Sequence, residues 1–392
     1  MTTASVELTV PDLSPAALSA VTEEVAATAA EYDRSGAFPA AGLQVAHRGG
    51  LLTATVATDY GGPGLGPADV ARILIALGEG DPSVALITAN TLAGHSAQAL
   101  GRQWPEQLYR ELVGRSVGEP TLVNAIRAEP ELGAPARGGL PATTATRSDD
   151  HWVLHGHKSF ATGGTGLAFH QVWVATDDGR VGHLLVDATS PGISWLETWD
   201  HLGLRASNTH DVIYDGVRVP LENFIEIPRV DGVYRDPAAA AGPGSFGHPA
   251  LYIGVARAAR TAFVDFARSR VPSALGRPIA TTERIQCVAG EIDTQIATAE
   301  TLLFGALARA EYEPEFVAQL SVIKVAIARA VTSAANTAVA ALGNAALTRH
   351  NPLERHLRDV LCVRVHPPQE DTALVAAGRR VLDVGSLSAP AT

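Results

Sequence analysis

Residues 143–160 read TTATRSDDHWVLHGHKSF, and this stretch decides the class of the fold. β-Branched or apolar residues alternate with polar ones on both sides of the Asp149–Asp150 pair, which is typical of two strands joined by a tight turn. Further runs of the same kind follow: HQVWVATDD (170–178), VGHLLVDATS (181–190) and HDVIYDGVRVP (210–220). The middle of the chain, residues 121–235, is therefore predicted to be a β-domain.

Helical patterns flank this middle section on both sides. The N-terminal section, residues 1–120, is rich in Ala and Leu at helical spacing, and Ser14 followed by Pro15 marks a helix start. The C-terminal section, residues 236–392, contains long periodic segments at 250–270, 284–310 and 315–343. Each is long enough to span a four-helix bundle. We therefore predict an α+β chain with a helical N-terminal domain, a middle β-domain and a C-terminal four-helix bundle.

The composition excludes several classes of function. A net charge of -11 with no Lys/Arg stripe argues against nucleic-acid binding. The only lysines are Lys158 and Lys324, and the only cysteines, Cys287 and Cys362, lie far apart without a CxxC motif. We therefore expect no metal site and no disulfide. The first residues lack a signal-peptide pattern and no run of about 18 apolar residues occurs, so a cytoplasmic protein without a membrane span is expected.

Five short motifs occur in a specific order along the chain: YGGPGLGPADVARILIALGEGDPSVAL (60–86), AEPELG (128–133), GHKSFATGG (156–164), GLRASNTHDVIYDGVRVP (203–220) and LERHLRDV (353–360). In order and spacing the chain resembles the acyl-CoA dehydrogenase superfamily over nearly its whole length. The resemblance implies that the middle domain is a β-barrel and that a flavin lies between it and the C-terminal helices. It also implies a homodimer or homotetramer in which a neighbouring subunit touches the cofactor.

The resemblance assigns flavin contacts within the middle section. Ala128, Glu129 and Gly133 align with the family's TEPGAGS loop, whose backbone N–H groups face the flavin pyrimidine edge; Ala128 replaces the usual threonine. Phe160 falls where an aromatic ring covers the flavin, and Thr162 where a hydroxyl or N–H contacts flavin N5. The FATG form of this motif resembles the flavin monooxygenases of the superfamily.

The GLRASNTHDV segment adds two further contacts. Arg205 and Ser207 match the family's GxRxS segment, which lies close to the flavin side of the β-domain. Ordinary turn chemistry explains Ser-Asn-Thr equally well.

The resemblance also assigns residues that would bind the phosphate and adenosine end of the cofactor. Arg268 or Arg270 stands for the family's pyrophosphate arginine, and Gln286 matches a family glutamine. Gly343 is retained in ALGNAAL, but the rest of the adenosine-binding pattern is not. Both FAD and FMN therefore remain open as the flavin.

The catalytic carboxylate of the dehydrogenases is missing at both positions where the family places it. Counting from Arg358-Asp359, the expected Glu falls on Pro367, with His366 immediately before it. The alternative position lies in residues 242–254, which contain no carboxylate. Glu370 and Asp371 follow within one helical turn, and Glu370 would act as the base if the loop shifts.

Histidine at this point is what the superfamily's monooxygenases show. A reduced flavin reacts there with O2 to give a C4a-hydroperoxide, and an imidazole such as His366 deprotonates the substrate or stabilises the peroxide. His95 resembles a second histidine that these enzymes place opposite the flavin. A histidine packed on a helix face is the alternative interpretation of His95.

Two functions follow from these motifs. The first is a two-component flavin monooxygenase that oxygenates a small organic substrate with reduced flavin from a partner reductase. The second is an α,β-dehydrogenase of an acyl thioester, carried by coenzyme A or a carrier protein, with a displaced base. A flavin-free structural relative is a third interpretation, and the retained flavin-contact motifs argue against it.

Overall fold

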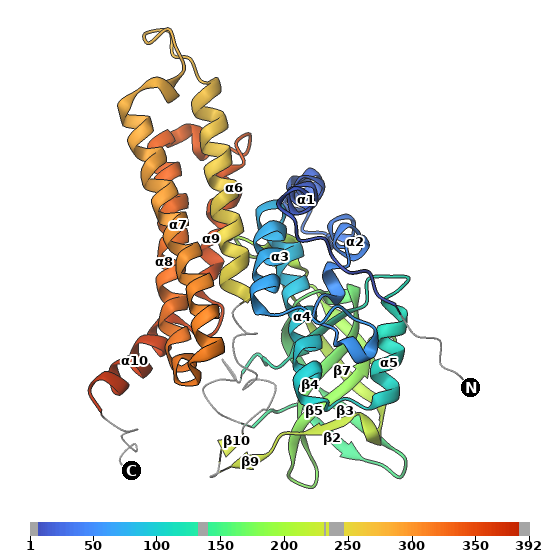
Figure 1. Cartoon of the computed structure of the whole chain (residues 1–392). Coiled ribbons are helices and arrows are strands. Elements are labelled where there is room, and N and C mark those ends of the chain that lie inside the picture. The colour runs from blue at the N-terminus through green and yellow to red at the C-terminus, as the bar shows by residue number, and fades with distance from the viewer. Residues whose placement is uncertain (1–6, 132–139, 231–232, 235–246, 384–392) are drawn as a thin grey trace. The chain divides into compact units, whose positions relative to one another are not determined.

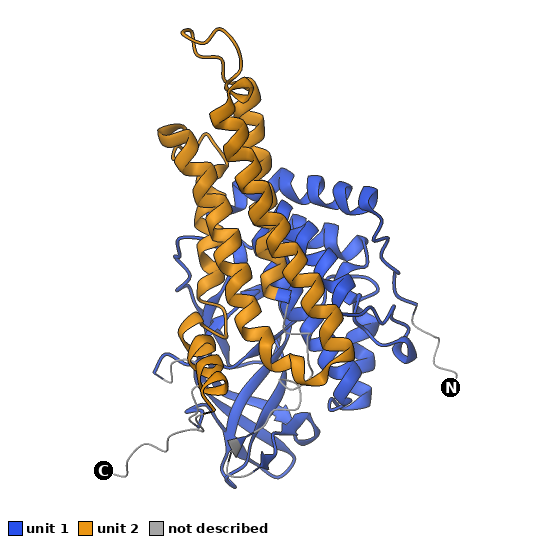
Figure 2. Ribbon diagram, turned by 60° about the vertical axis from the view of Figure 1, so that its left-hand side comes forward, with its two compact units in different colours: residues 1–247 blue, residues 248–392 orange. Residues whose placement is uncertain are grey.

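The computed structural model describes residues 7–131, 140–230, 233–234 and 247–383. The chain divides into two compact units, Met1–Gly247 and His248–Thr392, which Figure 2 distinguishes by colour. The structure divides the chain once, so the finer domain boundaries near residues 120 and 235 stay predictions.

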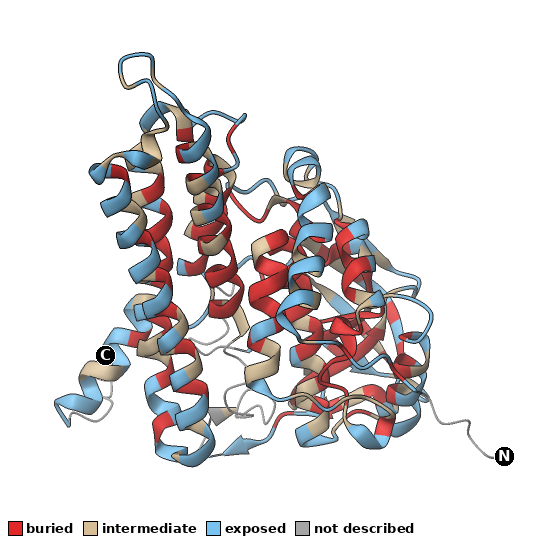
Figure 3. Ribbon diagram, turned by 45° about the horizontal axis from the view of Figure 1, so that its top comes forward, coloured by how far each residue is buried: buried red, intermediate tan, exposed pale blue. Residues whose placement is uncertain are grey.

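The first unit begins with five helices: α1 (Pro15–Ser35), α2 (Ala40–Arg48), α3 (Pro67–Gly80), α4 (Pro82–Gly101) and α5 (Glu106–Arg115). The predicted helix start is confirmed, because the Ser14 side chain accepts a hydrogen bond from the Ala17 N–H and Pro15 opens the helix. Most of α4 is buried (Figure 3), because it packs against α3 on one side and strand β1 on another.

The first unit continues into a mixed sheet whose strands are β1 (Leu122–Ile126), β2 (Thr144–Arg147), β3 (His151–Ala161), β4 (Leu167–Thr176), β5 (Val181–Asp187), β6 (Ile193–Leu196), β7 (His210–Pro220) and β8 (Phe224–Glu226). Their order is β6-β7-β3-β2-β4-β5-β8, with β1 added in parallel to β4. Figure 1 labels β2, β3, β4, β5 and β7 of this sheet. The predicted hairpin is confirmed as β2 and β3, which pair antiparallel. A separate hairpin joins β9 (Arg229–Val230) and β10 (Val233–Tyr234).

A hydrophobic core joins the helices of the first unit to its sheet. Tyr60, Trp104 and Tyr109 from the helical part meet Phe169 and Ile225 from the strands. The Tyr60 and Tyr109 rings lie edge to face, with centroids 4.7 Å apart. Aromatic burial on this scale fixes α5 and the loop before α3 against the sheet, which holds α4 and β1 in place.

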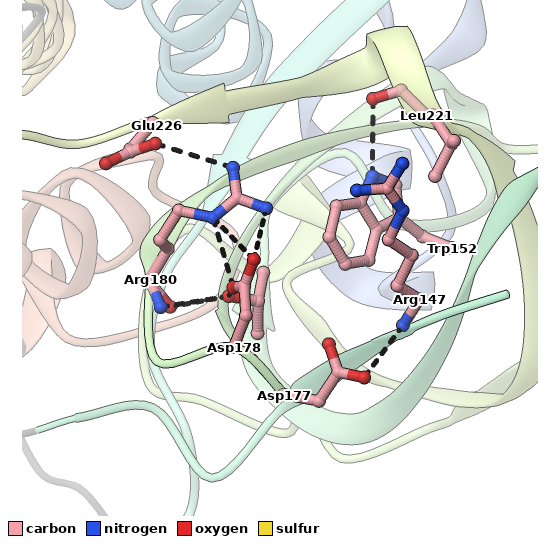
Figure 4. A network of polar contacts seen from close by, with 8 residues as sticks. Arg147, Trp152, Asp177, Asp178, Arg180, Leu221 and Glu226 are labelled. Atoms are coloured by element: carbon pink, nitrogen blue, oxygen red, sulfur yellow. Dashed lines mark hydrogen bonds and ion pairs between the residues drawn. The ribbon is translucent and has the colours of Figure 1, made fainter.

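A network of polar contacts lies at the end of the sheet where β3 begins (Figure 4). Arg180 binds the carboxylates of Asp178 and Glu226, and the Trp152 Nε1–H donates to the Leu221 carbonyl at 3.3 Å. Trp152 precedes Phe160 by eight residues on β3, about 26 Å at the rise of a strand. The network therefore stabilises the end of the sheet remote from the predicted flavin contacts.

The second unit consists of α6 (Gly247–Ser269), α7 (Glu283–Tyr312), α8 (Leu320–Leu342), α9 (Leu353–Leu361) and α10 (Glu370–Val381). Helix α7 packs along α8, and α8 also contacts α9 and α10. The ion pairs Arg257–Glu300 and Arg260–Asp293 join α6 to α7. The predicted C-terminal helical bundle is thus confirmed, and with it the three-section α+β fold.

One segment of the described residues, Pro314–Ala346, is long and apolar enough to cross a membrane by length and composition alone. It contains α8, whose apolar side packs against α7, α9 and α10. A core helix of a bundle passes the same test, so this segment is weak evidence for a membrane span.

Candidate active site

Two loops of the first unit interlock where β3 ends. The Gly163 N–H donates to the Ser207 carbonyl at 3.0 Å, and the Thr162 N–H donates to the Phe160 carbonyl at 2.9 Å. Gly164 has φ +45°, and a Cβ there would lie 2.0 Å from Asn208 Oδ1. Only glycine permits this approach. The FATGG and RASN motifs, separated in sequence, are therefore brought into direct contact.

A row of hydroxyl groups lies between these loops. Ser207 Oγ and Thr209 Oγ1 are 2.7 Å apart, and Thr209 donates to Thr162 Oγ1 at 3.0 Å. The Asn124 amide donates to the Thr162 carbonyl at 3.0 Å. Within the described part of the chain, the Thr162 hydroxyl accepts a hydrogen bond but has no acceptor for its own hydrogen. It can therefore donate that hydrogen to a ligand.

An aromatic surface lies beside the hydroxyl row. Phe160 is 56% exposed and has φ +59°, an uncommon conformation for a residue other than glycine. Its ring lies edge-on to Trp199 and His201, whose own rings stack with centroids 3.6 Å apart. The Trp199 Nε1–H donates to the Leu204 carbonyl at 2.9 Å, which fixes this indole. The strained turn at Phe160 thus exposes a large apolar ring to a ligand that binds at the end of β3.

A buried ion pair attaches the predicted flavin loop to β3. Lys158 Nζ lies 2.6 Å from Glu129 Oε1, and the Lys158 side chain is fully buried. The Glu129 carboxylate also accepts hydrogen bonds from the Ala142 and Thr143 N–H groups and the Thr143 hydroxyl. Its acceptor sites are therefore occupied by the protein itself, and Glu129 holds the loop rather than offering its carboxylate to a ligand.

Burial and pairing act in opposite directions on the two groups. Burial acts to raise the pKa of Glu129, but the hydrogen bonds from Lys158, Thr143 and Ala142 outweigh it and leave the pKa lowered. Burial lowers the pKa of Lys158 to about 8, against the opposing effect of Glu129. Both groups are therefore charged at neutral pH.

The neighbouring residues of the flavin loop have different positions. The Ala128 carbonyl accepts from the Ser159 N–H at 2.9 Å, so Ala128 lies against β3 as the motif comparison predicts. Gly133 lies outside the described residues. Arg205 donates through Nε to the Asp33 carbonyl at 2.8 Å and through Nη1 to the His201 carbonyl at 3.1 Å. These contacts fasten its loop to the end of α1, and a direct contact of Arg205 with a flavin stays a prediction.

His95 lies on α4 within the core of the first unit. Its Nδ1 is 3.0 Å from the Tyr109 hydroxyl, while Nε2 has no hydrogen-bond partner among the described residues. Burial lowers the pKa of His95 to about 4, so the ring is neutral at pH 7. These contacts match a histidine packed on a helix face, and a catalytic role for His95 stays a prediction.

In the second unit, His366 contacts two side chains of α6. The His366 and His248 ring centroids are 4.7 Å apart, and Tyr252 lies edge-on to His366 at 5.7 Å. His248 belongs to the stretch 242–254 that offered no carboxylate. Burial, followed by His248 and Lys324, lowers the pKa of His366 well below its ordinary value. His366 is thus a neutral imidazole at pH 7, able to accept a proton.

Lys324 of α8 holds the loop that carries His366. Its ammonium donates to the carbonyls of Val363 at 3.0 Å, His366 at 2.8 Å and Pro368 at 3.2 Å. The buried lysine thereby binds one carbonyl of the short turn Cys362–Arg364 and two carbonyls of the loop that follows it. Glu370, the alternative base, opens α10 and binds the Arg329 guanidinium, with Nε at 3.1 Å. In this conformation its carboxylate forms an exposed ion pair with Arg329.

The predicted phosphate-binding residues lie at the other end of the bundle. Arg270 follows the end of α6, Gln286 lies in the first turn of α7, and Gly343 ends α8 with φ +58° and open space around it. His248 and Arg270 are 22 residues apart along α6, about 33 Å at the rise of a helix. One chain therefore does not bring Arg270 and His366 together around a single ligand.

The residues at the end of β3 fit a flavin ring. A flat tricyclic ring needs an apolar face on one side and hydrogen-bond donors at its polar edge. Phe160 provides the exposed aromatic face, and Thr162 provides a hydroxyl whose hydrogen has no acceptor among the described residues. The exposed ring and this one hydroxyl therefore suit the face and the N5 edge of the cofactor implied by the motifs.

The chain matches the models of one protein family in three successive parts. Residues 13–109 match the N-terminal domain of acyl-CoA dehydrogenase, residues 125–217 its middle domain and residues 246–368 its C-terminal domain. A protein of Bacillus subtilis (strain 168) named "Putative acyl-CoA dehydrogenase YdbM" is 30% identical over 90% of this chain and 92% of its own length. The chain belongs to the acyl-CoA dehydrogenase family of oxidoreductases.

Solved structures of similar fold come from differently named proteins. Butyryl-CoA dehydrogenase from Megasphaera elsdenii has a TM-score of 0.82 and 22% identity, covering 96% of this chain and 100% of its own. KijD3 in complex with dTDP has a TM-score of 0.79 and 25% identity, covering 94% and 95%. KijD3 has also been solved with FMN and a dTDP-linked amino keto sugar. The fold alone therefore does not select one reaction.

Sequence reasoning missed His248, Thr209 and the contacts of both lysines. His248 and Thr209 carry no spacing signal, because each meets its partner only through tertiary packing. The lysines did carry a signal. Among 30 basic residues only Lys158 and Lys324 are lysine, and both are buried. In a chain that otherwise uses arginine, a compact ammonium at a buried position suggests a specific structural demand.

Proposed function

We propose that this chain is a flavin-dependent monooxygenase that oxygenates a small organic substrate, with His366 as the acid–base group. The observation that supports this most directly is the contact of His366 with His248 and Tyr252. Imidazoles occupy the region where a dehydrogenase of this family would carry its carboxylate. Glu370, the nearest carboxylate that the sequence offered, is bound to Arg329.

In this proposal the chain's own residues bind the cofactor and move a proton. Phe160 covers one face of the ring, and the Thr162 hydroxyl donates to its N5 edge. The ring of His366 is neutral and therefore in the form that accepts a proton from the substrate, although burial opposes the charged form that results. A bound reduced flavin would supply the electrons that activate molecular oxygen.

The proposal includes two kinds of partner. A separate flavin reductase would deliver the reduced cofactor, which is FAD or FMN. Because Arg270 lies about 33 Å along α6 from His248, which contacts His366, Arg270, Gln286 and Gly343 would serve a cofactor bound by a neighbouring copy. This arrangement requires a homodimer or homotetramer, which we propose to be cytoplasmic.

A second candidate function is the dehydrogenation of an acyl thioester. It is favoured by the similarity to the protein named "Putative acyl-CoA dehydrogenase YdbM". In this case a base must approach the substrate α-carbon, and Glu370 would have to leave Arg329. Breaking that contact costs little, because exposed ion pairs contribute at most about 1 kcal/mol.

Paired variants at the two candidate bases separate the functions. His366→Ala should reduce oxygen-dependent turnover by about 100-fold, as expected for loss of an acid–base group. Glu370→Gln should leave that turnover unchanged, and the exposed His350→Gln serves as the matched histidine control. Turnover that survives His366→Ala but is lost in Glu370→Gln, together with anaerobic flavin reduction by butyryl-CoA, would contradict the monooxygenase proposal.

A further inference from the structure

We infer that Trp199, with His201 stacked on it, is a positioning residue of the proposed flavin site. The two stacked rings hold the exposed ring of Phe160 in a direction that leaves one of its faces open to the flavin. Trp199 and His201 do not need to touch the flavin, because they act through Phe160. The inference rests on the flavin contact of Phe160 in the proposed function and assigns the support behind that contact.

Phe160 lies on an irregular part of β3. The pairing of β3 with β7 shifts register between Lys158 and Ala161. Two residues of β3, Ser159 and Phe160, therefore stand opposite the single residue Asp211, and Phe160 adopts φ +59°. A bulge of this kind changes the direction of a side chain, and its strained conformation persists only where surrounding contacts hold it. The contacts around Phe160 therefore decide where its ring points.

One carboxylate joins this bulge to the segment that carries the stacked rings. Asp211 accepts a hydrogen bond from the Ser159 hydroxyl through Oδ2 at 3.1 Å and from the Thr198 hydroxyl through Oδ1 at 3.0 Å. The Asp211 N–H donates back to Thr198 Oγ1 at 3.1 Å. Thr198 immediately precedes Trp199 in the sequence. The backbone that carries the indole is therefore fixed relative to the bulge.

Further hydrogen bonds fix the two rings of the stack. The Trp199 N–H donates to His210 Nδ1 at 3.1 Å, and the Trp199 Nε1–H donates to the Leu204 carbonyl at 2.9 Å. Arg205 donates to the His201 carbonyl at 3.1 Å. The indole and imidazole planes are inclined by only 13°, with centroids 3.6 Å apart. The stack is thus a fixed surface two rings thick.

The Phe160 ring lies beside this stack. Its centroid is 6.5 Å from the centroids of both Trp199 and His201, and its plane is inclined to theirs by 87° and 83°. Equal distances place Phe160 level with the gap between the two rings, against their edges. The stack therefore covers at most one face of Phe160, which agrees with an exposed fraction of 56%. Such edge-to-face contacts are favourable and limit the rotation of an exposed ring.

Loss of the stack should affect the flavin only through Phe160. The bulge would remain, but the Phe160 ring would lose both edge-to-face contacts and turn more freely. A ring that samples several directions spends less time face to face with the flavin. The flavin should then bind more weakly, and its surroundings should become less asymmetric.

Titration of the full-length protein with FMN, and separately with FAD, gives the dissociation constant from fluorescence quenching. The visible circular dichroism of the saturated protein reports how fixed the surroundings of the flavin are. His201→Leu and Trp199→Leu should weaken binding by about three- to tenfold and reduce this dichroism. Trp199→Phe keeps a ring in the stack and should retain most of the signal. Tyr312→Leu, at an exposed position of α7, is the matched control and should change neither value.

A double-mutant cycle shows whether the stack acts through Phe160. Phe160→Ala should weaken binding by about tenfold. In that background His201→Leu should add less than about twofold, because the ring on which it acts is gone. An equal further loss in both backgrounds would overturn the inference, because the stack would then act independently of Phe160.

The same variants distinguish failure of the inference from failure of the proposed function. If Phe160→Ala weakens binding but the folded His201→Leu and Trp199→Leu proteins keep the wild-type dissociation constant and dichroism, the inference is wrong and the flavin contact of Phe160 stands. If Phe160→Ala itself changes neither value, the proposed flavin contact is wrong and the inference fails with it.

Discussion

At the end of β3, the hydroxyl of Thr162 is the group that we expect to donate a hydrogen bond to the flavin. Thr162 Oγ1 accepts from Thr209 and retains its own hydrogen for a ligand, while Asn124 fixes the Thr162 carbonyl. The motif comparison identified Thr162 as a flavin contact, but it did not identify the support behind it. That support comes from β1 and from the loop before β7, which are 38 and 47 residues away.

Thr162→Val should weaken flavin binding by about five- to tenfold, because the variant loses one hydrogen bond to the ligand at nearly constant shape. Equilibrium dialysis or flavin fluorescence quenching measures the dissociation constant. Thr146→Val, on an exposed position of β2, is the matched control and should leave binding unchanged. Equal dissociation constants for Thr162→Val and the wild type would remove Thr162 from the flavin site.

His248 and His366 show at the residue scale where sequence reasoning stops. His366 could be located because it follows the Arg358-Asp359 pair at a defined distance. His248 stands 118 positions earlier in the chain, in a stretch searched only for carboxylates. No periodicity relates two residues that meet only when the start of α6 packs against the loop after α9.

At the scale of elements, the buried pair of Lys158 and Glu129 joins β3 to the loop that follows β1. The ion pair holds Glu129 against Lys158. The adjacent residues Ala128 and Ser159 therefore lie side by side, and the Ser159 N–H donates to the Ala128 carbonyl. Strands and helices were predictable because their periodicities are local. The ion pair was not predictable from the sequence, because it depends on the sheet order that brings β1 and β3 close together.

Lys158→Met should lower the free energy of unfolding by about 3–5 kcal/mol, because Glu129 is then left charged and unpaired in the interior. The double variant Lys158→Met/Glu129→Gln should recover part of this loss, because no buried charge remains. Urea unfolding followed by circular dichroism measures both. A loss below about 1 kcal/mol in the single variant would show that the pair is not the attachment of the flavin loop.

At the scale of the whole molecule, several histidines are buried in neutral form in both compact units. Burial lowers the pKa of His95 and His170 to about 4 in the first unit, and of His356 to about 3 in the second, where Arg355 and Arg358 add to the effect. The unfolded chain takes up protons near the ordinary histidine pKa of about 6.5, whereas the folded chain does not.

The stability from these groups is therefore fully present above about pH 6.5 and is lost as pH falls toward 4. Each buried histidine should contribute a slope of up to about 1.4 kcal/mol per pH unit within that range. Denaturant unfolding between pH 7.5 and 4.5 tests this. His170→Gln should flatten the slope and the exposed His350→Gln should not; a pH-independent free energy of unfolding would contradict the assignment.

The order of the three sections was also predictable, because each has its own periodicity and five motifs occur in family order. The separation of the predicted phosphate-binding residues from His366 along the bundle was not predictable from the sequence. Arg270, Gln286 and Gly343 were assigned from motifs alone. Only the antiparallel run of α6, α7 and α8 shows that they lie at the end of the bundle opposite His248, which contacts His366 and is about 33 Å from Arg270 along α6.

The measurement that tests the central claim most directly is rapid mixing of the photoreduced, flavin-loaded protein with oxygen, followed by absorbance. The monooxygenase proposal predicts an oxygen-dependent transient whose spectrum differs from both oxidised and reduced flavin, and no anaerobic bleaching of the oxidised protein by acyl-CoA. Direct return to the oxidised spectrum without a transient, together with bleaching by acyl-CoA, would contradict it and identify the chain as a dehydrogenase.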